Sequence, residues 1–254
     1  MLLASDRVPT MDNAENDEGS VWMPVSDLMA GLMMLFLLLS IVMMLQARAD
    51  TELAQQQTER VIEVAEEYRD IRKEIYEALA SRLGEDRLRE NWKATLDPET
   101  LSVEFVSPID ATPLFPVQQT SVTPYYQTVL SEFFPVYLSV LQDFTAAIEE
   151  VRIEGHTSSE WSARASETQK YFRNMTLSQG RAKSVLEFVY GISDDSQGDQ
   201  AWMRQHISAV GLSSSKLVLD ADGLEDKIKS RRVTFRILTN ADAQMRRIHR
   251  DGDI

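Results

Sequence analysis

A single acidic side chain stands at the start of the most apolar stretch of the chain. Asp27 is followed by eighteen uncharged residues, 28–45, in which only Gly31 and Ser40 are weakly polar. At 1.5 Å per residue this run is about 27 Å long, enough to span a bilayer with some tilt. A carboxylate at membrane depth costs roughly 2.5–3.5 kcal/mol, so it marks a candidate functional group. Asp27 is therefore the first candidate for chemistry, and an acid that only reaches back to the membrane surface is the alternative.

Other residues that could do chemistry form weaker patterns. His156 lies near Ser158 and Ser159, but nucleophilic catalysis also needs an orienting acid and a nucleophile elbow, which the sequence lacks. The three histidines are too far apart for a metal site, and there is no cysteine. The Asp-x-Asp-Gly sequence at 220–223 lacks the third ligand position and the closing Glu of a calcium loop. We expect a protein that is not an enzyme and uses no metal or cofactor.

Length and charge narrow the class of protein. The 254 residues suffice for one membrane segment and one ordinary domain, and a net charge of −14 argues against nucleic-acid binding. A cleaved signal peptide is the alternative to a membrane helix, because residues 47–49 read Ala-Arg-Ala. The preceding tail is acidic, however, and the apolar run is longer than a signal peptide requires. We therefore predict a retained membrane helix.

A helical spacer is predicted after the membrane segment, from Gln46 to about Leu96. The stretch is rich in Glu, Gln, Ala, Arg and Lys, has no Pro, and has Gly84 as its only Gly. Apolar residues follow a 3-4-3-4-3 spacing, close to three heptads: Val61, Val64, Tyr68, Ile71, Ile75 and Ala78. This spacing fits a dimeric coiled coil, and it also fits an amphipathic helix packed on its own domain. Pro98 disfavours helix at Asp97 and ends the segment.

The rest of the chain alternates strand and helix patterns. Strands are predicted at 101–106, 151–155, 207–211 and 232–238, mostly from alternating apolar and polar residues. Helices are predicted at 125–148, with a kink at Pro135, and at 177–190. The segment 108–124 contains four prolines and is expected to be irregular. This order predicts an α/β sandwich with a mixed sheet.

The membrane segment resembles the ion-carrying helix of MotB-type stator subunits. The shared pattern is Trp22, then Asp27-x-Met29, then Met33 and Phe36 in an apolar helix. TolR and ExbD have the same layout of short tail, single helix with an early Asp, and periplasmic domain. The resemblance implies that Asp27 carries protons through an ion-driven motor. Ala30 and Gly31 lie on the same helix face as Asp27 and would allow another helix to approach closely.

The C-terminal half resembles the OmpA-like peptidoglycan-binding domain. Three motifs carry the resemblance: Ile153-x-Gly155-His156-Thr157, Asn174-x-x-Leu177-Ser178-x-x-Arg181-Ala182, and Arg231-Arg232-Val233. It implies a binding helix with Asn174, Leu177 and Arg181, and Arg suits a carboxylate because its planar fork binds both oxygens. The family usually has Asp where this chain has Ser158, and that Asp helps to bind the amino end of diaminopimelate. The alternatives are that Arg181 pairs with a nearby acid and that Asn174 caps a helix.

Together the two resemblances imply five segments. They are a cytoplasmic tail (1–20), a transmembrane helix (21–45), a periplasmic helical linker (46–97), an OmpA-like domain (98–240) and a C-terminal tail (241–254). The wall-binding domain would set the orientation in a bacterial inner membrane, with the N-terminus cytoplasmic. One helix cannot enclose a proton path, so the resemblance implies a MotA-like polytopic partner, five copies around two of this chain.

Residues 23–32 and Ser158 depart from the usual flagellar sequence. With these departures the chain resembles the ZorB family of the Zorya anti-phage system, whose ZorA partner forms the motor. We therefore expect a peptidoglycan-anchored motor subunit in anti-phage defence. The alternatives are a flagellar or Tol/Exb-type motor subunit and a passive tether between membrane and wall.

Overall fold

The first element of the computed structural model is one long helix, α1 (Glu18–Leu83). The structure describes residues 18–106, 113–162, 164–193, 198–240 and 242, so most of the predicted N- and C-terminal tails lies outside it. Within α1, Val25–Glu63 is long and apolar enough to cross a membrane, and its apolar side chains are exposed. This agrees with the predicted membrane segment, although the helix already begins at Glu18.

Two compact units divide the chain, one ending at Arg60 and one beginning at Val61. In the second unit, Ile75, Leu79 and Leu83 at the end of α1 are fully buried in the core, and Ile71 and Ala78 pack against it. The later positions of the heptad pattern therefore contact their own domain, which was one of the two interpretations of the spacing. The folded unit begins well before residue 98, because these side chains are part of its core.

The prediction of helix up to Leu96 is wrong. Gly84 adopts a left-handed conformation (φ +73°), which ends α1 as a glycine commonly does. A short π-helix, η1 (Arg87–Asn91), follows, and then strand β1 (Ala94–Asp97), which pairs antiparallel with β2 (Ser102–Val106). The linker predicted at 46–97 thus ends inside the sheet.

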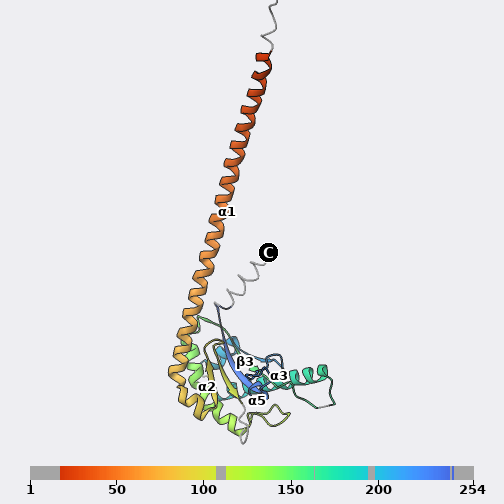
Figure 1. Ribbon diagram of the computed structural model, residues 1–254. Helices are drawn as coiled ribbons and strands as arrows, with labels where there is room; N and C mark the ends of the chain where they lie inside the picture. Colours follow the sequence, from red (N-terminus) through yellow and green to blue (C-terminus); the bar gives the residue numbers. More distant parts are fainter. Residues whose placement is uncertain (1–17, 107–112, 163, 194–197, 241, 243–254) are drawn as a thin grey trace, which may run out of the picture. The chain divides into compact units, whose positions relative to one another are not determined.

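The sheet has five strands in the order β1-β2-β5-β3-β4, with β3 (Ile148–Gly155), β4 (Ile207–Gly211) and β5 (Arg232–Thr239). Among the described strands only the pair β3 and β4 is parallel, and the other pairs are antiparallel. Figure 1 labels β3 and the long helix α1. The predicted mixed sheet is confirmed, as are its four predicted strands, and β1 is the additional one.

The described part of the domain contains four further helices: α2 (Pro124–Asp143), α3 (Glu167–Ile192), α4 (Asp199–His206) and α5 (Lys227–Ser230). Helix α2 begins with Thr123 as N-cap and contains Pro135, as predicted, but it ends before residue 148, which belongs to β3. Helix α3 begins ten residues before the predicted start at 177, because Ser166 and Gln169 form a capping box. Helix α4 was not predicted from the sequence.

Aromatic rings and a close backbone contact at one glycine set how the helices pack on the sheet. Phe133 of α2 packs edge-on against Phe105 of β2 and Phe235 of β5, with ring centroids 4.9 and 5.3 Å apart. On α3 the contact is between backbones, because a Cβ at Gly155 would lie 2.2 Å from the carbonyl oxygen of Ser178. Glycine at the end of β3 therefore sets how closely α3 approaches the sheet.

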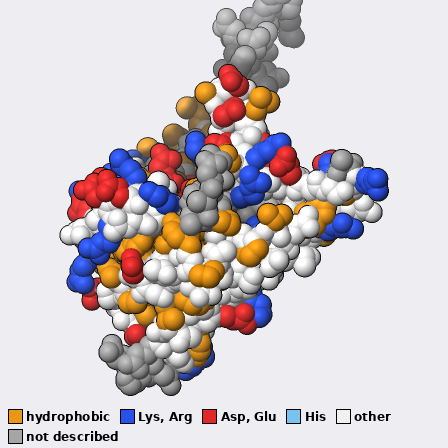
Figure 2. Space-filling model, turned by 90° about the horizontal axis from the view of Figure 1, so that it is seen from below, with side chains coloured by type: hydrophobic (Ala, Val, Ile, Leu, Met, Phe, Trp, Pro, Cys, Tyr) orange, Lys and Arg blue, Asp and Glu red, His pale blue; other side chains and the backbone are white. Residues whose placement is uncertain are grey.

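Charged side chains of both signs share one face of the molecule. On the face shown in Figure 2, acidic and basic side chains are intermixed rather than gathered by sign. This mixture agrees with a sequence that contains no acidic block.

Candidate functional site: a cationic cavity beside α3

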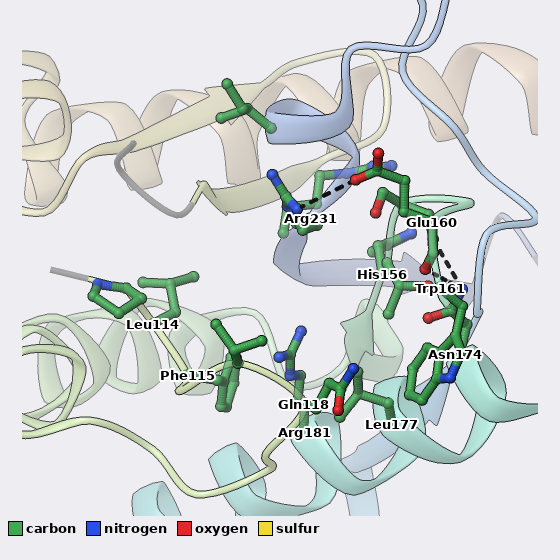
Figure 3. Close-up of a pocket in the computed structure, with 16 residues that line it drawn as sticks. Leu114, Phe115, Gln118, His156, Glu160, Trp161, Asn174, Leu177, Arg181 and Arg231 are labelled. Carbon is green, nitrogen blue, oxygen red and sulfur yellow. Dashed lines mark hydrogen bonds and ion pairs between the residues drawn. The ribbon is translucent and has the colours of Figure 1, made fainter. Parts of the chain in front are cut away.

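A cavity of about 680 Å³ lies where β3 ends against α3. Its walls come from segment 113–118 before α2, from loop 156–161 after β3, from α3 itself and from residues 228–232 (Figure 3). The three residues predicted from the binding-helix motif, Asn174, Leu177 and Arg181, all line it. The spacing of three and four residues places them on one face of α3.

Arg181 is a charged group in the cavity whose surroundings come from the segment before α2. Its Nε donates a 3.0 Å hydrogen bond to the carbonyl of Gln119, and its guanidinium lies 4.9 Å from the ring centroid of Phe115. No carboxylate pairs with it among the described residues, so the predicted alternative of a nearby acid does not apply to this part of the chain. Burial, helped by the charge of Arg231, lowers the pKa of Arg181 to about 10. Arg181 is still cationic at neutral pH, and an anion is the missing partner that its chemistry favours.

Asn174 shapes the cavity by holding a loop. Its buried Nδ2 donates to the carbonyls of Ser158 (3.1 Å) and Glu160 (3.3 Å). The helix-cap alternative is wrong, because Ser166 is the N-cap of α3 and Asn174 lies two turns inside the helix. Leu177, half-buried, adds an apolar surface between Asn174 and Arg181. Asn174 therefore fixes the loop that Leu177 and Arg181 face.

Ser158 is buried in the cavity wall, at the position where the resemblance would place an acid. Glu160 is the one carboxylate among the described residues that line the cavity. Its Oε1 lies 2.5 Å from Nζ of Lys227, and its Oε2 lies 4.0 Å from the guanidinium of Arg231. The Lys227 ammonium lowers the pKa of Glu160, so this acid is ionised at neutral pH.

His156 is buried at the base of the cavity with no arrangement for catalysis. Its Nε2 lies 3.3 Å from Oε2 of Glu154, and burial lowers the pKa of the imidazole, so it is neutral at pH 7. The hydroxyl of Ser159 donates to Glu225 instead of to a histidine. Among the residues that the structure describes, no group of three His, Asp or Glu side chains could hold a metal ion. The arrangement suits the binding of an anionic group.

No protein-family model matches the chain. A curated relative, the Zorya protein ZorB of Escherichia coli, is 41% identical over 234 residues, which cover 92% of this chain and 94% of the relative.

The chain belongs to the ZorB family.

Several solved structures are similar to this ZorB-family chain. A MotB-like protein from Desulfovibrio vulgaris gives a TM-score of 0.46 at 18% identity, covering 68% of this chain and 93% of the other. The cell wall anchor of the T6SS from Pseudomonas aeruginosa gives 0.41 at 20% identity, covering 64% and 97%. The periplasmic domain of Helicobacter pylori MotB gives 0.39 at 18% identity, covering 60% and 81%.

Asp27, the other predicted site residue of this ZorB-family chain, lies in the first compact unit. It is exposed on α1, with the small residues Ala30 and Gly31 one turn further along the helix. A Cβ at Gly31 would meet no atom of the chain within 4 Å. Among the described residues, no hydrogen bond or ion pair to the Asp27 carboxylate is present. The structure thus provides Asp27 with a helix face but with no surrounding pocket.

Sequence reasoning missed several residues of the cavity. Arg231 was noticed only as part of a family motif, and Glu160 and Trp161 were not noticed at all. Phe115, which lies under Arg181, belongs to the proline-rich segment that was predicted to be irregular. One signal was available, namely that Glu160 and Trp161 closely follow the Gly155-His156-Thr157 motif and so were candidates for the same edge of the sheet.

Proposed function

We propose that this chain is the peptidoglycan-anchored subunit of a proton-driven inner-membrane motor in a Zorya anti-phage system. The observation that carries the proposal is the 41% identity with the Zorya protein ZorB, which extends over 92% of the chain and so includes both the apolar helix and the cavity domain. A protein that couples membrane and wall needs both parts in one chain.

Wall binding follows from the chemistry of the cavity. Peptide stems of peptidoglycan end in free carboxylates, and Arg181 offers a planar guanidinium without a carboxylate partner among the described residues. A carboxylate in the cavity would accept charge-assisted hydrogen bonds, which are worth roughly 1.5–3 kcal/mol each. Asn174 would act indirectly, by holding loop 156–161, and Leu177 would contact the aliphatic part of the stem.

Motor function follows from the apolar helix. We propose that Asp27 takes up and releases protons, with the N-terminus in the cytoplasm and the cavity domain in the periplasm. Each proton that crosses the membrane field delivers about 2.3 kcal/mol per 100 mV. A single exposed helix cannot enclose such a path, so a polytopic partner of the MotA or ZorA type would surround it, in the proposed ratio of five partner copies to two of this chain.

The wall-binding part is tested by co-sedimentation of the full-length protein with purified sacculi. Arg181→Gln should lower the apparent affinity about tenfold or more, because it removes the charge that a stem carboxylate requires. Arg204→Gln is the matched control, since Arg204 donates to the Tyr190 hydroxyl outside the cavity. Equal retention of the two variants, with equal melting temperatures, would contradict the assignment of the cavity to wall binding.

A further inference from the structure

The two edges of the sheet differ in how their sequences discourage pairing with another strand. Among the described strands, β1 and β4 stand at the ends of the strand order, so each has one side without a neighbouring strand. Such an edge presents backbone N–H and C=O groups that another chain can pair with, and charges and prolines oppose this. Strand β1 contains Asp97 and is flanked by Lys93 and Pro98. Strand β4 reads Ile-Ser-Ala-Val-Gly, with neither a charge nor a proline, so its edge needs another form of protection.

A side chain of α3 covers the edge of β4. Nε2 of Gln179 donates a 3.1 Å hydrogen bond to the carbonyl of Ala209, and the N–H of Gly211 donates a 2.6 Å hydrogen bond to Oε1 of Gln179. One residue of a parallel neighbouring strand would bind β4 in the same way, with its N–H on the first of these residues and its C=O on the second. The carboxamide of Gln179 therefore takes the place of a peptide unit at the end of the sheet.

The same face of α3 continues as an apolar surface. Leu186 and Tyr190 follow Gln179 at spacings of seven and four residues, which places all three on one side of the helix. With Met203 of α4 and Ile207 of β4, these two residues line a largely apolar hollow of about 330 Å³. Because Ile207 is the first residue of β4, a strand paired with β4 would lie beside this hollow and cover part of its apolar lining.

We propose that the outer edge of β4 is a strand-pairing surface for β4 of a second copy of this chain, and that Gln179 keeps this surface closed. An antiparallel pair centred on Ala209 would be symmetric, and it would place Ile207 opposite Gly211 of the second copy, which has no side chain to clash. No like charges would meet, because residues 207–211 are uncharged. The pair would require the Ala209 carbonyl and the Gly211 N–H, the two groups that Gln179 binds.

The closing contact can be released without moving the helix. Gln179 is exposed, so a rotation of its side chain is enough to uncover the edge, and it does not line the cavity at Arg181. The surface is thus separate from the proposed wall-binding site, although both depend on side chains of α3.

Cysteine cross-linking of the full-length protein in membranes tests the pairing. The chain has no cysteine, so Ala209→Cys introduces a single thiol. In the symmetric pair the two Cβ atoms at this position would be about 4.5–5.5 Å apart, which a disulfide can bridge after a small adjustment. Under a mild oxidant, Ala209→Cys alone should cross-link slowly. Combining it with Gln179→Leu or Gln179→Ala should raise the rate about tenfold, because two competing hydrogen bonds are removed.

Two controls make the result specific. Lys183→Leu adds an apolar side chain one turn further along α3, where Lys183 contacts Glu187 and not β4, so it should leave the cross-linking rate of Ala209→Cys unchanged. Thr95→Cys places the thiol on β1, the other edge, and should not respond to the Gln179 substitutions.

Each contrary result would overturn a stated part of the proposal. Equal cross-linking of Ala209→Cys with and without Gln179, at an unchanged melting temperature, would overturn the closing role. A large fall in melting temperature in both Gln179 variants, without faster cross-linking, would mean that the carboxamide only holds α3 on the sheet. If Gln179→Leu bound a labelled peptide of residues 205–213 without cross-linking, the edge would accept an extended segment of another protein, and a second copy would be the wrong partner.

Discussion

Asp27 and Arg181 are both charged groups that lack an oppositely charged partner among the described residues, but their surroundings differ. The fold encloses Arg181 with the Phe115 ring, backbone carbonyls and a loop held by Asn174. Asp27 is exposed on α1, at the start of the stretch 28–45, whose apolar side chains are also exposed. The walls of the cavity at Arg181 come from its own domain, whereas in the proposed function a protein partner would supply the walls around Asp27.

The largest expected effect is on transport, through Asp27. Asp27→Asn removes the titratable group and should abolish proton flux and phage protection, while expression, membrane insertion and partner assembly are retained. Proton uptake into vesicles that contain the chain and its partner measures the flux directly. A phage plating assay measures its consequence.

A control on the same helix makes this prediction specific. Asp50→Asn removes an exposed acid beyond the apolar run and should leave both readouts unchanged. Full activity of Asp27→Asn would favour a passive tether. Asp27 would then have no role in transport, and the contrast with Arg181 would concern structure alone.

Two glycines allow the comparison to be tested without touching either charged group. At Gly155 a Cβ would lie 2.2 Å from the Ser178 carbonyl oxygen. The backbone of α3 would have to shift to relieve this clash, and such a shift is destabilising. Gly155→Ala should therefore destabilise the cavity domain by about 3 kcal/mol, or roughly 6–12 °C in melting temperature, and weaken sacculus binding.

At Gly31 a Cβ would meet no atom within 4 Å. Gly31→Ala should leave the melting temperature unchanged and reduce co-purification with the partner, because small residues allow helices to pack closely in membranes.

The reverse pattern would refute the distinction between the two sites. If Gly31→Ala lowered the melting temperature while partner binding was normal, the apolar helix would pack within its own chain. If Gly155→Ala folded normally and still bound sacculi, α3 would not need its close approach to β3 to form the cavity.

The sequence predicted the parts of the structure that depend on short-range patterns. Alternation was sufficient for β2 and β5. The family resemblance grouped Asn174, Leu177 and Arg181, but the helix predicted at 177–190 left Asn174 outside it, whereas α3 carries all three. Strand β1 was missed because its four residues have no strong strand pattern and follow a long helical stretch. Arg231 was missed as a cavity residue because only tertiary folding brings it to the same cavity as Arg181, fifty residues away in the chain.

The heptad spacing also shows that a sequence pattern does not identify the contacts of a helix face. Ile71, Ile75 and Ala78 have a period that suits a partner helix and their own domain equally well, and burial of Ile75 in the core decides for the domain. Periodicity identifies an apolar face, but the surface that covers it depends on the three-dimensional arrangement.

The smallest expected effect is a pH dependence confined to the cavity domain. Burial lowers the pKa of His156 below its ordinary value of about 6.5, so the unfolded chain binds the proton more readily than the folded one. The stability associated with a neutral His156 is complete above about pH 6.5 and is lost as the pH falls towards the folded pKa. The loss cannot exceed about 1.4 kcal/mol per pH unit for one group.

The charges around His156 modify this behaviour without reversing it. Glu154 on β3 and Glu104 on β2 favour the protonated imidazole, and Arg232 on β5 opposes it, but desolvation is the largest influence. Melting of His156→Gln between pH 7.5 and 5 should therefore show a smaller loss of stability than the wild type, with His206→Gln as the control for removing a histidine elsewhere. An unchanged pH slope would mean that other groups cause the acid sensitivity. All three histidines lie beyond the first sixty residues, so a histidine-dependent loss of stability should weaken sacculus binding at acidic pH.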